Sequence, residues 1–182
     1  MNLKSVTLVL FEGAEPVYSI VNKAIEAAVN FFYDEATMEV LEMAIPDEAY
    51  NDERGQIEAT LLIKALNENT QLDKKDLTIA LLIKDMYYKN MNFIFGLADI
   101  KRKRIIVSTY RLERDYSTQH VAPVDDLNER VFKEVLHEIG HVFGFEHCPN
   151  KSCVMSFSPT LFDVDNKLPL LCEVCRSRLK TF

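Results

Sequence analysis

The sequence of 182 residues has no apolar run that approaches the roughly 20 residues needed to span a bilayer. It also has no internal repeat and no low-complexity tract. The first residues, Met1–Val6, contain only a short apolar run and lack the pattern of a secretory signal. These absences predict a protein that neither crosses a membrane nor enters the secretory route, so we expect it in the cytoplasm.

An excess of basic residues is also missing. The formal net charge is −7 at pH 7, which argues against general nucleic-acid binding. The basic cluster Lys101–Arg104 is short and has no interleaved aromatic residues, so we interpret it as a solvated turn between two strands. Hydrophobic residues make up 48% of the chain and charged residues 27%, as is typical of a soluble globular protein. We expect a monomer, by default, without nucleic-acid or membrane partners.

Histidine is scarce, yet three of the four histidines fall in one stretch with the spacing H-E-x-x-H-x-x-G-x-x-H. His137 and His141 are four residues apart, so both project from one face of a helix. Gly144 tolerates the left-handed backbone that ends a helix, and the turn then carries His147 back toward the other two. Three neutral imidazoles leave the fourth position of a zinc ion open for water, which is typical of a catalytic site.

Glu138, next to the first of these histidines, is placed to act as a general base. Zinc lowers the pKa of its water to near neutrality, and Glu138 can take the proton and later pass it to a leaving amine. We therefore predict a zinc hydrolase that cuts peptide bonds. The alternative is a catalytically silent, zinc-organised module that only binds peptides. The sequence does not distinguish an endopeptidase from an aminopeptidase.

All four cysteines follow the third histidine and form two close pairs: Cys148 with Cys153, and Cys172 with Cys175. Such pairs suit a closed tetrahedral zinc site, which would stabilise a tail too short to bury a core of its own. Two disulfides, a redox pair and buried free thiols are the competing interpretations. Because we expect an intracellular chain with reduced thiols, we favour a structural zinc, and hence two zinc ions per chain.

The segment from His137 to Cys175 resembles the archaemetzincin family of metzincin metallopeptidases. The resemblance rests on the zinc motif, the immediate Cys148, the C-x-M motif of Cys153–Met155 and the late C-x-x-C motif. It implies that His137, His141 and His147 bind the catalytic zinc and that Glu138 accepts a proton. It further implies that Met155 forms the hydrophobic floor called the Met-turn and that the four cysteines bind a second zinc. Without the family, Met155 reads as an ordinary core methionine.

The remaining sequence predicts five strands: Ser5–Phe11, Thr37–Ala44, Leu77–Ile83, Asn92–Ala98 and Arg104–Tyr110. Leu77–Ile83 is apolar on both faces, so we expect it at the centre of the sheet. Helices are expected from Pro16 to Phe32, around Gly55–Leu66, and from a capping box of Asp126 and Glu129 through the apolar stripe Val131–Val142.

This order predicts an α/β fold, bordering on α+β. We expect a twisted mixed five-stranded sheet with two N-terminal helices and an active-site helix, as the resemblance also implies. Residues 1–144 would form the N-terminal subdomain, and residues 145–182 a small C-terminal subdomain with the Met-turn and the cysteine site.

Four residues outside the motif have open roles. Arg111 could steer a substrate carboxylate or pair with an acidic side chain. We interpret His120 as structural, and Asp163 and Asp165 as solvated loop carboxylates rather than residues that tune the cleft.

Overall fold

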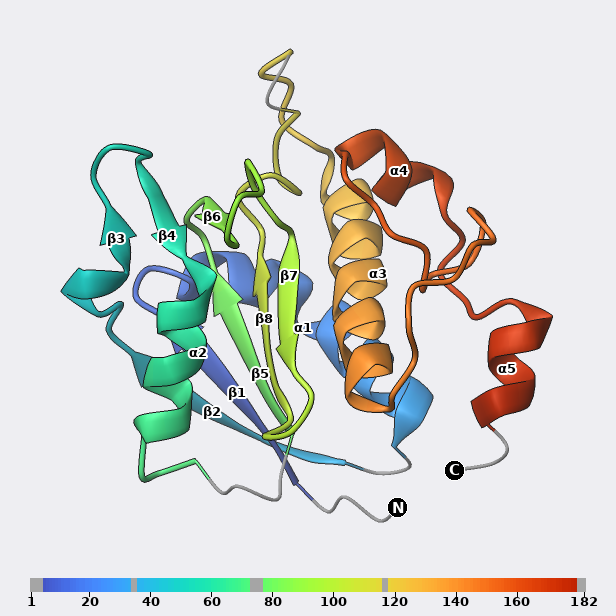
Figure 1. Ribbon diagram of the computed structural model, residues 1–182, viewed down its shortest axis with the longest axis horizontal. Helices are drawn as coiled ribbons and strands as arrows, with labels where there is room; N and C mark the ends of the chain where they lie inside the picture. The colour runs from blue at the N-terminus through green and yellow to red at the C-terminus, as the bar shows by residue number, and fades with distance from the viewer. Residues whose placement is uncertain (1–4, 34–35, 73–76, 116–117, 180–182) are drawn as a thin grey trace.

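The centre of the computed structural model, which describes residues 5–33, 36–72, 77–115 and 118–179, is a five-stranded sheet (Figure 1). The pairs β2–β1, β1–β5 and β5–β8 are parallel, whereas β7 is antiparallel to β8 and forms one edge. The sheet is therefore mixed, as predicted. In spatial order its strands are β2 (Thr37–Met43), β1 (Ser5–Phe11), β5 (Leu77–Leu82), β8 (Arg104–Ser108) and β7 (Gly96–Asp99).

Alternation of side chains along β5 divides the core into two layers. Leu77, Ile79 and Leu81 belong to one cluster of buried side chains, and Ala80 and Leu82 belong to a second cluster on the other face. All six residues of β5 are buried. The predicted central position of this strand is confirmed.

Three longer helices cover the two faces of the sheet (Figure 1). α1 (Glu15–Phe32) and α3 (Val124–Val142) pack on each other and share the first core layer, while α2 (Ala59–Glu68) packs on the second. Pro16 lies in the first turn of α1, where a helix needs no N–H from it. The predicted fold class, with two helices before the active-site helix, is confirmed.

Several short elements were not predicted, because segments of two to seven residues are too short to show a clear periodicity. They form a second, three-stranded sheet, a 3-10 helix and two helices near the C-terminus. These are η1 (Asp47–Ala49), β3 (Tyr50–Asn51), β4 (Gln56–Glu58), β6 (Met86–Tyr87), α4 (Leu161–Asn166) and α5 (Glu173–Leu179). β4 also explains why α2 begins later than the predicted Gly55.

The strand predicted at Asn92–Ala98 is wrong in its first half, since β7 begins only at Gly96. The carbonyl groups of Met91 and Asn92 accept hydrogen bonds from side chains instead of from a neighbouring strand. Arg54 Nη2 donates to both at 3.0 Å, and Gln56 Nε2 donates to Asn92 at 2.8 Å. The small sheet thus holds the loop that leads into β7.

The capping box predicted at Asp126 and Glu129 is also wrong. Pro123 is the N-cap of α3 and provides no side-chain cap, so Asp126 lies inside the first turn. There its negative charge interacts favourably with the partial positive charge of the helix N-terminus. Glu129 instead pairs with Lys133 one turn later, at 2.6 Å.

The basic cluster is a turn only in part. Residues 101–103 form the turn between β7 and β8, with Lys103 in the left-handed region at a φ of +53°. Arg104, by contrast, is a buried residue of β8, and its Nη1 donates to Thr78 Oγ1 at 2.8 Å. The predicted exposed turn is therefore wrong for Arg104.

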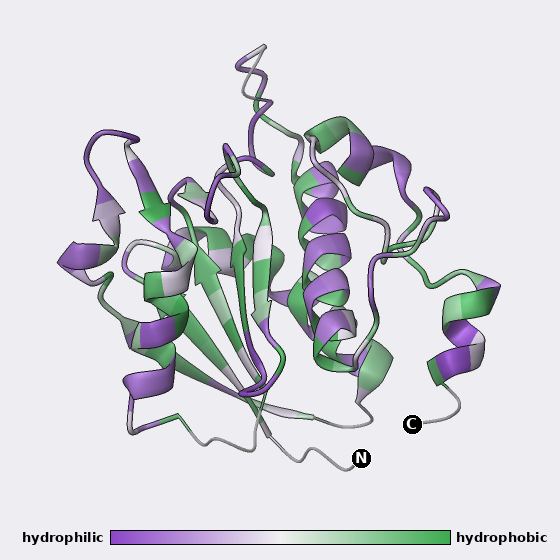
Figure 2. Ribbon diagram, viewed as in Figure 1, coloured by the Kyte–Doolittle hydropathy of each residue, from purple (hydrophilic) through white to green (hydrophobic). Residues whose placement is uncertain are grey.

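α3 lies between the sheet and the C-terminal segment, so its second half is buried on nearly every side (Figure 1). Purple, hydrophilic bands run along it in Figure 2. Its buried residues include the polar or charged Lys133, Glu134, His137 and Glu138. Burying charged and polar groups costs free energy, so such groups are normally hydrogen-bonded or paired, or they serve a function. No helix among the described residues has the length and the apolar character that crossing a bilayer requires.

We expect the core around β5 to dominate stability. Leu81→Ala removes buried methyl groups on the central strand and should lower the free energy of unfolding by about 2–5 kcal/mol. Val40→Ala, at a side chain 45% exposed on edge strand β2, should change it by no more than about 0.5 kcal/mol. Urea unfolding of both variants and the parent measures these changes, and equal losses would contradict a dominant core around β5.

Candidate metal centre and active-site cleft

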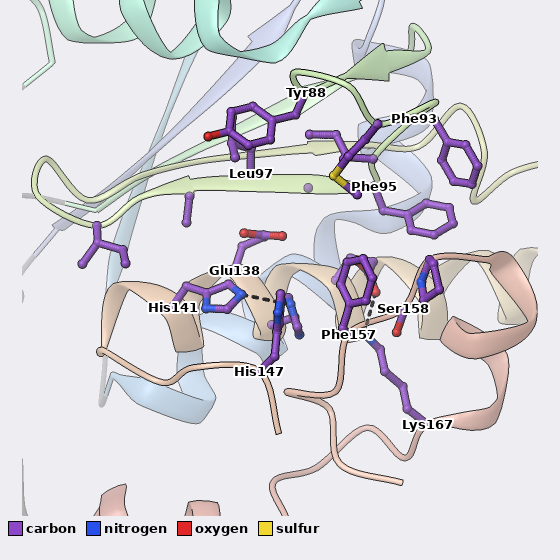
Figure 3. Close-up of a pocket in the computed structure, with 18 residues that line it drawn as sticks. Tyr88, Phe93, Phe95, Leu97, Glu138, His141, His147, Phe157, Ser158 and Lys167 are labelled. Atoms are coloured by element: carbon purple, nitrogen blue, oxygen red, sulfur yellow. Dashed lines mark hydrogen bonds and ion pairs between the residues drawn. The ribbon is translucent and has the colours of Figure 1, made fainter. Parts of the chain in front are cut away.

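Three histidine side chains converge at the C-terminal end of α3. The Nε2 atoms of His137 and His141 are 3.1 Å apart, and ligand nitrogens of these two residues and of His147 all lie within 4.8 Å of one another. His137 is buried, His141 is half-buried and His147 is exposed. In Figure 3 the rings of His141 and His147 gather beside Glu138, so the cluster faces a cleft.

A Schellman motif at the end of α3 returns His147 to the helix. Gly144 has a φ of +82°, its N–H donates to His141 O, and the Phe145 N–H donates to Gly140 O. A side chain at Gly144 would be strained by this backbone conformation. The reversal brings the ring centroid of His147 to 5.3 Å from that of His137.

The histidine cluster fits a tetrahedral metal ion. His137 Nδ1 donates to Val154 O at 2.8 Å and His141 Nδ1 donates to Phe145 O at 2.7 Å, so each Nε2 keeps its lone pair for a ligand. Two such lone pairs at 3.1 Å repel each other unless a cation lies between them. Zinc bonds of 2.0–2.1 Å would separate two nitrogens by about 3.4 Å, close to what is observed.

Burial also prepares these rings for a metal. It lowers the pKa of His137 well below its ordinary value, helped by the nearby ammonium of Lys167. Burial likewise lowers the pKa of His141 and of His147. The neutral imidazole favoured in this way is the form that binds metal.

The four cysteines form a second cluster, with all four sulfur atoms within 4.8 Å of one another. They are free thiols, and Cys148 Sγ lies 3.8 Å from Cys172 Sγ, far beyond a disulfide bond. Zinc–sulfur bonds of 2.3 Å in a tetrahedron give a sulfur–sulfur distance of about 3.8 Å. A hydrogen bond from the Cys175 backbone also lowers the pKa of Cys172 to about 7, which favours the thiolate that a metal needs.

Met155 packs behind the histidines. Its side chain fills the space beside Gly140, where an added Cβ would lie 2.9 Å from Met155 Cε. Gly140 lies between His137 and His141 on α3, so the fully buried methionine packs against the helix between the two residues that carry the rings. Its carbonyl accepts from the Cys148 N–H at 2.8 Å, which links it to the cysteine cluster.

The carboxyl group of Glu138 lies against the backbone of edge strand β7 (Figure 3). A Cβ on Gly96 would come within 2.7 Å of Glu138 Cδ, so Gly96 leaves the room that this carboxyl group occupies. Burial raises the pKa of Glu138 well above its ordinary value, Glu134 raises it further, and Lys167 lowers it. A raised pKa suits a group that must accept and return a proton near neutrality.

The cleft between α3 and β7 has a volume of about 340 Å³. Its walls are mostly apolar, with Phe93, Phe95 and Leu97 from the β7 side and Phe157 and Pro159 from the C-terminal segment (Figure 3). The histidines and Glu138 lie at its base. Such a cleft is large enough for one or two side chains of a peptide.

Two charged residues of the cleft were missed by the sequence analysis. Glu134 lies one turn before His137 and Glu138, and that spacing could have indicated that it shares their face. Lys167, its ion-pair partner at 2.7 Å, is 33 residues further on and carried no signal.

The remaining residues singled out by sequence lie outside the catalytic cluster. Arg111 pairs with Asp85 at 2.6 Å, so it neutralises an acid. Asp163 closes a capping box on α4, and Asp165 accepts from Arg130 Nε at 2.6 Å. Both aspartates lie in helix α4, so the prediction of a loop is wrong, but Asp165 is exposed to solvent and neither residue lines the cleft. His120 is exposed and does not line the cleft.

Comparison with known proteins adds independent information. The sequence model described as Peptidase family M54 matches residues 14–181. The archaemetzincin of Halobacterium salinarum is 37% identical over 158 residues, which cover 86% of this chain and 90% of that protein.

Two crystal structures are similar over nearly the whole chain. The archaemetzincin of Methanopyrus kandleri has a TM-score of 0.84 at 34% identity, covering 97% of this chain and 93% of that one. The archaemetzincin of Archaeoglobus fulgidus has a TM-score of 0.76 at 31% identity, covering 96% and 99%.

The raised pKa of Glu138 predicts a pH-dependent stability difference in the metal-free chain. The folded state holds this proton more tightly than the unfolded state, so the parent loses stability as pH rises from about 4.5 through the raised pKa. Glu138→Gln removes that loss. The free energy of unfolding of the variant should exceed that of the parent by more at pH 8 than at pH 4.5. Urea unfolding in excess chelator measures the difference, and a pH-independent gap would contradict a buried, raised Glu138.

Proposed function

Because this chain belongs to peptidase family M54, the archaemetzincins, and is a zinc metallopeptidase, we propose that His137, His141 and His147 hold its catalytic zinc and that Glu138 is its general base. Substrates of such an enzyme are peptides or proteins. The reaction would take place in the cleft between α3 and β7.

The observation that carries this proposal is the convergence of three imidazoles beside one buried glutamate. The Nδ1 hydrogen bonds of His137 and His141 aim their Nε2 atoms at a common point, and His147 completes the set from the turn. When bound there, zinc lowers the pKa of a coordinated water and polarises the scissile carbonyl. Three protein ligands leave room for that water, as in catalytic sites.

Glu138 moves the protons. Its carboxylate takes a proton from the attacking water and, as a carboxylic acid, delivers it to the leaving amine. The raised pKa and the buried position against Gly96 support both halves of this cycle, since the acid form is stable between them.

Edge strand β7 would hold the substrate in an extended conformation. β7 is an outer strand of the main sheet, and Gly96, Leu97 and Ala98 line the cleft. Its outer edge can pair with a peptide backbone through main-chain hydrogen bonds. The peptide bond to be cut would then lie over the histidines.

The four cysteines would hold a second, structural zinc. Cys148 directly follows His147, so a metal bound at the cysteines would fix the turn that presents this ligand. Four protein ligands leave no position for water, which suits a structural role.

Glu138→Gln should separate metal binding from turnover. The zinc content should stay unchanged, because the imidazoles are untouched, while the turnover number falls by a factor of about 10²–10⁴. Glu146→Gln, at an exposed glutamate next to His147, is the matched control and should keep activity within about twofold. A Glu138→Gln protein as active as the parent would refute Glu138 as the base.

Zinc analysis tests the two-metal prediction. After dialysis the parent should contain two zinc ions per chain, and Cys175→Ala should contain one or none and unfold at lower urea concentration. Val174→Ala, at an exposed residue of the same C-x-x-C motif, should match the parent. Two zinc ions retained by Cys175→Ala would contradict the cysteine site.

A further inference from the structure

A buried ion pair closes one end of the cleft. Lys167 Nζ lies 2.7 Å from Glu134 Oε1, and the two side chains are 0% and 5% exposed. Both residues line the cleft together with His137 and Phe157. Figure 3 shows Lys167 reaching from the C-terminal segment, below Phe157, toward α3.

Stability does not account for this pair. Removing two charges from water is costly, and replacing a buried ion pair by apolar side chains is often neutral or stabilising. Within the described part of the chain, Glu134 is also the one hydrogen-bond acceptor for the Lys167 ammonium. Because the pair has so few hydrogen-bond partners and lies in the cleft, it points to a role in binding the substrate.

One oxygen atom of the pair is available to a bound side chain. Glu134 Oε2 accepts no hydrogen bond from the residues that the structure describes, although Oε1 is engaged by Lys167. Glu134 lines the cleft, and Oε2 is not among the fully buried side-chain atoms that lack a hydrogen-bond partner, so part of its surface is accessible to a bound side chain. The Glu134–Lys167 pair, which we call the floor of this end of the cleft, therefore offers a hydrogen-bond acceptor whose charge is already neutralised.

We propose that this end of the cleft is a specificity pocket for a substrate side chain with an apolar stem and a neutral hydrogen-bond donor at its tip, such as glutamine. The stem would pack between Phe95, Phe157 and Pro159, and the amide N–H would donate to Glu134 Oε2. This assignment rests on the proposed function, because it places the substrate in this cleft.

Other side chains fit the pocket less well. Leucine would cover Oε2 without a donor, and a desolvated, unpaired acceptor is costly. Arginine or lysine would bring a positive charge beside Lys167, whose carboxylate partner already neutralises it. Glutamate would set a carboxylate against Oε2, with like charges in contact.

Peptide binding tests the pocket without turnover. Zinc-loaded Glu138→Gln protein is mixed with fluorescent peptides that differ at one position, carrying Gln, Leu, Glu or Arg at each position in turn. At one position, Gln should bind roughly fivefold to tenfold tighter than Leu, and tighter than Glu or Arg, in fluorescence anisotropy. Equal binding of Gln and Leu at every position would overturn the proposal.

Two changes at the floor, each made in the Glu138→Gln background, should redirect this preference. Glu134→Gln keeps an acceptor for Lys167 but offers an amide donor and leaves the ammonium uncompensated, so Glu peptides should become the tightest. Glu134→Leu combined with Lys167→Met makes the floor apolar, so Leu should bind tighter than Gln. If either folded variant keeps the Gln preference, the pocket assignment is wrong.

A matched control removes a similar pair elsewhere. Lys64 and Glu68 form an ion pair at 4.0 Å on α2, with side chains 61% and 67% exposed. Lys64→Met combined with Glu68→Leu should leave the peptide preference unchanged. Circular dichroism and zinc content establish which variants fold.

Turnover assays of the parent on the same peptides separate the two proposals. A parent that cuts none of them contradicts the proposed function, and the anisotropy series still decides the pocket. A parent that cuts peptides without a Gln preference contradicts the pocket and leaves the proposed function intact. The same two floor changes are also made in the parent, which retains Glu138. If they shift the pH profile of turnover there without changing the peptide preference, the pocket is overturned, since the pair would then act on Glu138 alone.

Discussion

Two hydrogen bonds join the histidine helix to the chain that follows it, and the geometry of the site depends on them. His137 Nδ1 donates to Val154 O, and His141 Nδ1 donates to Phe145 O. Each bond orients an imidazole ring and, at the same time, anchors the C-terminal segment on α3. The packing of that segment and the direction of the two Nε2 atoms are therefore one constraint.

The cysteine cluster extends this constraint outward. Cys148 N–H donates to Met155 O, and Val154 N–H donates to Leu170 O, so hydrogen bonds hold the backbone under the histidines from both sides. The two segments that make these bonds also carry the cysteine pairs. A metal bound there would fix the floor of the active site through the backbone, with no direct contact between the two metal sites.

The sequence is informative where a rule is local. The six-residue apolar run of β5 indicates a central strand, and the spacing of His137, His141 and Gly144 indicates a helix that ends in a reversal. These patterns need only neighbours within a turn or a strand. The fold class and the composition of the histidine cluster could be read for that reason.

The sequence is uninformative where the determinant lies elsewhere in the chain. The loop before β7 is irregular because Arg54, distant in sequence, binds its carbonyl groups. Asp126 and Glu129 match a capping box, yet Pro123 starts the helix earlier. Gly96 is an ordinary strand residue in the sequence, and only the fold puts the Glu138 carboxyl group against it.

Two buried lysines, Lys133 in α3 and Lys167 in the C-terminal segment beside it, show how a charge that joins structural elements differs from a charge at the cleft. Lys133 is 2% exposed and has three acceptors: Glu129 Oε1 at 2.6 Å, and the carbonyl groups of Val164 and Asp165 at 3.2 Å each. Its hydrogen bonds fasten α4 to α3, which accounts for its burial.

Lys167 is buried as deeply as Lys133 but makes fewer hydrogen bonds. Among the described residues its ammonium bonds to Glu134 alone, and the second oxygen of that carboxylate, on a residue that lines the cleft, accepts no hydrogen bond. A buried charged group with all its hydrogen bonds made inside the protein holds structural elements together. A charged group at a cleft with an unused acceptor can still form a hydrogen bond with a ligand. Lys133 and Glu134, which are neighbours on α3, thus take part in these two kinds of contact.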